Sequence, residues 1–131
     1  YKLEKSVILY GFKSGKELDE IYDKCDIGVD SLGLYRKNVE KVSSLKAKEY
    51  GARGLPVITT SPIDVYDSDF KYQLILPNDD SVFDMQLIID FYKNIKSEIQ
   101  KGINVPNIIR NEGMEKASMK STFIKIMDYI K

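Results

Sequence analysis

The chain has 131 residues, of which 43% are apolar and 31% are charged, and this composition is typical of one globular domain with a modest core. The 20 basic and 20 acidic residues give a formal net charge of zero, so the overall charge does not indicate a nucleic-acid-binding protein. One cysteine and no histidine exclude an internal disulfide, histidine general bases and histidine metal ligands. A single unpaired cysteine suits a reducing compartment, and we expect the cytoplasm.

The predicted secondary structure alternates strands and helices along the chain. The first helix begins at Ser14, which has the Ser-x-x-Glu spacing of a capping box with Glu17. Short apolar runs predict strands at residues 7–10, 27–29, 57–59 and 72–76, and helical periodicity or capping signals predict further helices before Gly54, from residue 81, at 108–115 and at 118–130. This alternation indicates an α/β fold with a parallel sheet and right-handed crossovers.

The helix that ends at Gly54 has unusually clear boundaries. Ser43 or Ser44 can cap its first turn, Gly54 can adopt the left-handed conformation beyond its last turn, and Pro56 prevents its continuation. Its first turn carries Lys46 and no acidic residue, so the positive end of the helix dipole attracts an anion. We therefore expect the backbone amides of Ser43, Ser44 and Leu45 to bind phosphate, with Lys46 as a supporting charge.

Glu49 follows on the same helix, about 9 Å along the axis from the first amides at roughly 1.5 Å per residue. This length is close to the reach from a diphosphate to its ribose, and a carboxylate at that point can accept hydrogen bonds from both ribose hydroxyls. The alternative is a solvated glutamate on an ordinary capped helix, because surface glutamates are common.

The motif Ser-Ser-Leu-Lys-x-x-Glu-Tyr-x-x-x-Gly-x-Pro-Val-Ile over residues 43–58 resembles the donor-site motif of the GT-B glycosyltransferases, in particular retaining family four and its capsule and cell-wall relatives. Flanking segments agree in order with that family: a strand and glycine at 7–12, a helix at 17–22, a strand at 25–29 and a Ser-containing helix start at 117–119. The resemblance spans roughly residues 6 to 130. It implies a Rossmann-like three-layer sheet with helices on both faces, namely the C-terminal half-domain of a GT-B fold.

The resemblance also implies an activity and a set of partners. It implies that residues 1–131 are a single, partial C-terminal domain that binds a nucleotide diphosphate sugar, within a longer hexosyltransferase of bacterial polysaccharide synthesis. The nucleobase is expected to contact the backbone at Gly11 and Phe12, although a tight strand-to-helix turn explains Gly11 equally well. A missing N-terminal domain would bind the glycan or lipid-linked acceptor at the inner face of the membrane. No metal or other cofactor is expected, because helix amides and basic side chains can stabilise the leaving diphosphate.

Two departures from the family are visible. The family commonly has a glutamate eight positions before the ribose-binding one, thought to contact the donor sugar, and this chain has Lys41 there. Glu40 and Asp30 are the nearby acidic candidates for that contact. The family's C-terminal domain also begins with two further strand-helix units and a basic pair that grips the diphosphate, so we interpret the chain as a fragment that is inactive alone.

Three alternatives stay open. Asp67-Ser68-Asp69 has the Asp-x-Asp pattern that holds a divalent metal in the GT-A glycosyltransferases, but Asp and Ser are also common in turns. Among enzymes, a nucleotide-sugar epimerase of similar fold is the nearest competitor. A non-enzymatic receiver-like module is the third, since Asp26 and Asp30 lie at strand ends, although no lysine follows the fourth predicted strand.

Overall fold

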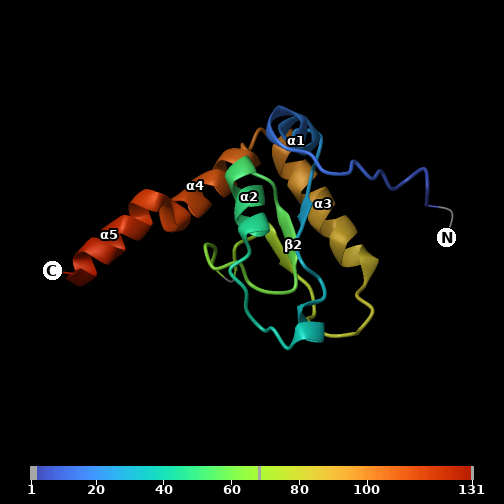
Figure 1. Cartoon of the computed structure of the whole chain (residues 1–131). Coiled ribbons are helices and arrows are strands. Elements are labelled where there is room, and N and C mark those ends of the chain that lie inside the picture. Colours follow the sequence, from blue (N-terminus) through green and yellow to red (C-terminus); the bar gives the residue numbers. More distant parts are fainter. Residues whose placement is uncertain (1–2, 68, 131) are drawn as a thin grey trace.

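The computed structural model describes residues 3–67 and 69–130 and shows a mixed α/β fold around a small parallel sheet (Figure 1). Its elements, in chain order, are α1 (Gly15–Tyr22), β1 (Gly28–Val29), the 3-10 helix η1 (Leu34–Lys37), α2 (Leu45–Arg53), β2 (Val57–Thr59), β3 (Gln73–Ile75), α3 (Met85–Gln100), α4 (Val105–Ala117) and α5 (Met119–Ile130). The alternation of strands and helices predicted from the sequence is therefore correct for most of the chain.

The sheet has three parallel strands in the order β1-β2-β3. Val57 of the central strand lies opposite Gly28 on one side and Gln73 on the other. All three residues of β2 are buried, as expected for the central strand of a parallel sheet covered by helices. In Figure 1 the strands lie between α2 and α3.

The hydrophobic core joins β2 to the helices around it. Its members come from α2, β2, the segment between β2 and β3, α3 and α4: Ala47, Val57, Ile63, Val65, Tyr66, Tyr72, Ile95, Val105 and Ile109. Helix α4 packs on α2 as well as contributing to this core. Helix α5 runs away from the body in Figure 1, and its Phe123 and Tyr129 are exposed.

The predicted strand at residues 7–10 is wrong. These residues have no regular structure, and the exposed fractions of their side chains range from 49% at Tyr10 to 90% at Leu9. A strand is stable only when a neighbouring strand satisfies its backbone groups, and in the described part of the chain no strand pairs with this segment. An apolar, β-branched run was therefore insufficient evidence for a strand.

The first predicted helix starts where expected but without its capping box, and the helix expected from residue 81 starts later. Ser14 is the N-cap residue of α1, but its side chain makes no capping hydrogen bond, and Glu17 instead binds Lys13 at 3.2 Å. The helix expected from residue 81 begins at Met85, because Oδ1 of Asp84 accepts the Gln86 amide at 2.8 Å and makes Asp84 the cap.

Candidate functional site

Helix α2 has the boundaries that its sequence predicts. The side chain of Ser44 caps it, since its Oγ accepts the Ala47 amide at 3.2 Å. Gly54 ends the helix in the left-handed region at φ 77°, and a Cβ there would lie 2.6 Å from the carbonyl oxygen of Pro106. Both the positive φ and the contact with α4 therefore require glycine.

The N-terminus of α2 lies at the carboxyl end of β1. Asp30 directly follows β1, and its Oδ1 accepts a hydrogen bond from Oγ of Ser44 at 2.9 Å and lies 3.4 Å from Nζ of Lys46. The carboxylate of Asp30 is buried, whereas Lys46 is 45% exposed. The first turn of α2 has no acidic residue of its own, as predicted, but the fold places a carboxylate beside it. Part of the positive charge at this end is therefore already neutralised.

A second ionic contact lies beside Ser43. Its hydroxyl donates to Oδ2 of Asp64 at 2.9 Å, and Nζ of Lys48 lies 2.6 Å from that hydroxyl and 3.0 Å from the same carboxylate oxygen. Burial acts to raise the pKa of Asp64, but the hydrogen bonds from Lys48 and Ser43 outweigh it and hold the pKa below its ordinary value. Asp64 was not predicted as a partner of Ser43, because it lies 21 positions away in the chain, after β2, and only the fold brings the two side chains together.

Glu49 lies further along α2 and joins an ionic cluster with α1. Its Oε1 accepts a hydrogen bond from Nη2 of Arg53 at 3.2 Å, and the same nitrogen lies 2.8 Å from Oδ1 of Asp19. The guanidinium carbon of Arg53 lies 4.1 Å from the ring centroid of Tyr22. Burial, followed by the charge of Glu49, raises the pKa of Tyr22. Glu49 is 43% exposed, so its carboxylate is held by Arg53 and still accessible to a ligand.

The structure brings together only some of the predicted site residues. Ser43 and the N-cap Ser44 directly precede α2, and the other three predicted residues on this element lie on its first turns: Leu45, Lys46 and Glu49. Leu45 is 81% exposed. Gly11 and Phe12 lie on the exposed stretch before α1, where Phe12 is 94% exposed. In the described part of the chain, no hydrogen bond or ion pair joins these two residues to α2. Their contact with a nucleobase stays a prediction.

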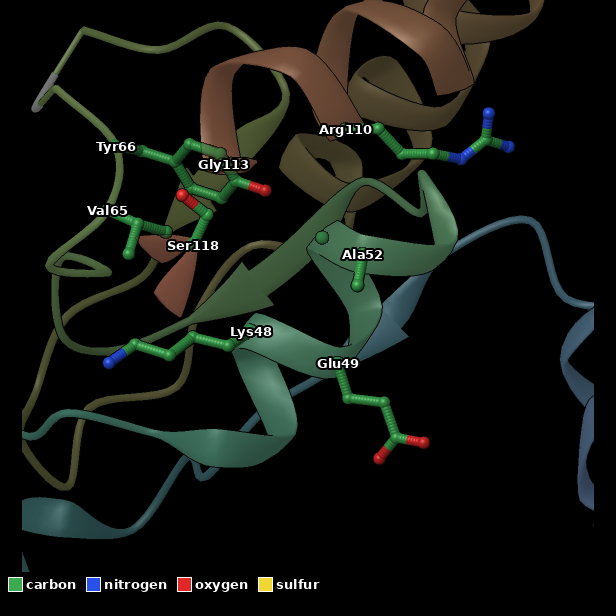
Figure 2. Close-up of a pocket in the computed structure, with 9 residues that line it drawn as sticks. Lys48, Glu49, Ala52, Val65, Tyr66, Arg110, Gly113 and Ser118 are labelled. Carbon is green, nitrogen blue, oxygen red and sulfur yellow. The ribbon is translucent and has the colours of Figure 1, made fainter. Parts of the chain in front are cut away.

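A groove of about 320 Å³ lies on the side of α2 that faces α4. Val65, Tyr66 and Gly113 line it together with α2 residues, and Figure 2 shows the charged ends of Lys48, Glu49 and Arg110 pointing away from one another. The groove is therefore mainly apolar and lacks a cluster of converging charges.

Within residues 3–67 and 69–130, no group of acidic or cysteine side chains has an arrangement that would hold a metal ion. Asp67 instead binds Lys116 at 2.8 Å, and Ser68 of the Asp-x-Asp pattern lies outside the described residues. Over the same residues, no helix is long and apolar enough to cross a bilayer.

No family model matches the chain, and neither a curated protein nor a solved structure matches it. The functional interpretation therefore depends on the residue motif of α2 and on the geometry around it.

Proposed function

We propose that the chain is the donor-binding part of a GT-B glycosyltransferase, in which it binds a nucleotide diphosphate sugar for transfer to a glycan acceptor. The observation that carries this proposal is the placement of the start of α2 at the carboxyl end of β1, where Oγ of Ser44 donates to Oδ1 of Asp30 at 2.9 Å. Ligands of open α/β sheets bind outside the carboxyl ends of the strands. The resemblance of residues 43–58 to the donor-site motif adds the chemical class of the ligand.

The diphosphate would bind at the N-terminus of α2. The Ala47 amide is bonded to Oγ of Ser44 and the Lys48 amide to the carbonyl of Ser44. In the described part of the chain, the helical amides left for an anion at this end are therefore those of Leu45 and Lys46, next to the expected Ser43 and Ser44 amides that precede the helix. The 45% exposure of Lys46 allows its ammonium group to turn from Asp30 toward a phosphate. A phosphate would therefore compete with Asp30 for this lysine.

The ribose would bind at Glu49, one to two turns further along α2. Arg53 occupies one hydrogen-bonding position of Oε1, while a carboxylate has about four such positions on its two oxygens. Enough acceptor capacity therefore remains for both hydroxyls of a ribose. In this proposal the leaving diphosphate is stabilised by amides and Lys46 without a metal ion, and the acceptor is bound by another domain at the cytoplasmic face of the membrane.

The first test is a titration of the isotope-labelled chain with UDP, GDP, ADP and their sugar conjugates, followed by backbone amide shifts in NMR spectra. This method detects even millimolar binding. We expect the largest shifts at Ser43 to Glu49, and the preferred diphosphate identifies the base. If none of the nucleotides causes specific amide shifts in this region, the proposal is wrong.

A substitution at Glu49 tests the ribose contact. Glu49→Ala removes a half-exposed ion pair with Arg53 that contributes only about 0.3–0.5 kcal/mol, so the melting temperature should stay nearly constant while nucleotide affinity falls about tenfold or more. The matched control is Glu112→Ala, which removes a similar ion pair with Lys116 on α4 and should leave affinity unchanged. A large loss of stability with unchanged affinity would instead make Glu49 a structural residue.

A further inference from the structure

We infer that Arg53 is a positioning residue for Glu49, and that Asp19 of α1 holds Arg53 in place for this role. This inference rests on the proposed function, because Glu49 needs a fixed orientation only if its carboxylate recognises a ligand. It adds two residues to the proposed ribose site, and neither belongs to the motif from which the site was predicted.

The geometry of Arg53 supports this role. A single nitrogen, Nη2, lies 2.8 Å from Oδ1 of Asp19 and 3.2 Å from Oε1 of Glu49. The plane of the guanidinium is held from a third side by the ring of Tyr22, whose centroid lies 4.1 Å from Cζ of Arg53. The side chain of Arg53 is only 26% exposed. Arg53 is therefore fixed by three contacts from two helices.

Fixing Arg53 also fixes Glu49. A free glutamate on a helix surface samples several rotamers, and a ligand that needs one of them must overcome the lost conformational freedom. The hydrogen bond from Arg53 selects one orientation in advance and takes up one of the roughly four acceptor positions of the carboxylate, so that positions remain for a hydroxyl donor. Preorganisation of this kind raises affinity and, above all, specificity for the group that the carboxylate recognises.

Charge balance between the carboxylates of Asp19 and Glu49 is a second reason to regard Arg53 as a positioning residue for Glu49. The carboxylates of Asp19 and Glu49 both lie within 3.2 Å of one nitrogen, so without the guanidinium two like charges would face each other. Repulsion would then turn the two carboxylates away from each other. Side-chain exposure is 55% for Asp19 and 43% for Glu49, so both carboxylates are free to move. Loss of Arg53 therefore releases Glu49 from its position as well as from its hydrogen bond.

The test measures ribose discrimination. Wild-type chain and variants are titrated with the three pairs UDP and 2′-deoxy-UDP, GDP and 2′-deoxy-GDP, and ADP and 2′-deoxy-ADP, and the ratio of the two dissociation constants is determined for the pair that binds best. A ratio is insensitive to partial unfolding of a variant, because both nucleotides bind the same folded fraction. A purely structural role of Arg53 therefore leaves the ratio unchanged.

The wild-type chain should prefer the ribonucleotide by about tenfold or more, as expected for hydrogen bonds to a charged acceptor. Arg53→Met should reduce this preference to about threefold or less, Asp19→Asn should give an intermediate value, and Arg53→Lys should restore it in part. The matched control is Lys116→Met, which removes a cation paired with Asp67 and Glu112 rather than with Asp19 or Glu49 and should leave the ratio unchanged.

An unchanged ratio in Arg53→Met, with normal discrimination by the wild-type chain, would overturn the inference and leave the proposed function standing. If the wild-type chain binds a nucleotide but shows no preference for the ribonucleotide, Glu49 does not recognise the ribose and Arg53 has no positioning role. A wild-type chain that binds none of the nucleotides would overturn the proposed function itself.

Discussion

The contact between Gly51 and Tyr66 gives the sharpest stability prediction. A Cβ built on Gly51 would lie 2.2 Å from the Tyr66 hydroxyl oxygen and 3.3 Å from Cζ of the ring. Tyr66 is 7% exposed and stacks on Phe70 at 4.3 Å, so its ring has little room to move. Overpacking of this kind costs about 1–3 kcal/mol, and the better helix propensity of alanine offsets about 1 kcal/mol. Because the ring is confined and the approach of the added Cβ is so close, we take the upper part of that cost, about 2–3 kcal/mol, and expect Gly51→Ala to lower the free energy of unfolding by about 1–2 kcal/mol.

Tyr66→Phe should reverse this loss. The Tyr66 hydroxyl is buried and has no hydrogen-bond partner among the described residues, and burial raises the pKa of Tyr66 to about 12. Removal of an unsatisfied buried hydroxyl contributes about 1–3 kcal/mol, so Tyr66→Phe alone should be stabilising. In the double variant the nearest ring atom is the carbon at 3.3 Å, a contact that a small shift accommodates. The double variant should therefore be at least as stable as the wild-type chain.

The assay is urea unfolding of the wild-type chain, both single variants and the double variant, analysed as a double-mutant cycle. Gly113→Ala is the control, because its Cβ would lie 3.3 Å from the Tyr66 hydroxyl and should cost less than the same change at Gly51. If Gly51→Ala is as stable as the wild-type chain, or if the two substitutions are additive, the steric reasoning is wrong.

Two further predictions concern charged groups. Asp30→Asn removes the negative charge that lies 3.4 Å from Lys46, so it should increase diphosphate affinity about threefold or more in the NMR titration, and a weaker affinity would contradict competition between Asp30 and phosphate. Hydrogen bonds from Lys71 and then Tyr72 hold the pKa of Glu98 below its ordinary value, so the stability that this carboxylate contributes is present at neutral pH and is lost as the pH falls through the lowered pKa. The difference in melting temperature between the wild-type chain and Glu98→Gln should therefore be present at pH 7, begin to shrink near the pKa of about 4.3 that an unperturbed glutamate has, and disappear only below the lowered pKa of Glu98. A difference that persists in acid would show that Glu98 acts through packing.

Much of the candidate site was predictable because its backbone is determined locally. The cap at Ser44, the stop at Gly54 and the barrier at Pro56 each act on amides or dihedral angles within a few residues, and all of α2 lies where these signals place it. The strand at residues 57–59 was predictable for a similar reason, since a short β-branched run follows directly after a helix stop and is buried in the sheet. The motif on α2, with Glu49 beyond its first turn, was therefore visible in the sequence.

The partners of these residues were decided by the tertiary structure alone. Asp30 is separated from Ser44 by 14 positions, and Asp64 from Ser43 by 21, and the two carboxylates meet α2 only because the parallel strands bring the loops after β1 and β2 to one edge. The wrong prediction of a strand at residues 7–10 has the same cause: its apolar pattern is local, whereas strand formation depends on a pairing strand elsewhere in the chain. Helix boundaries follow from interactions between residues close in sequence, while the charge that an incoming phosphate would meet depends on which distant loops the sheet places beside the helix.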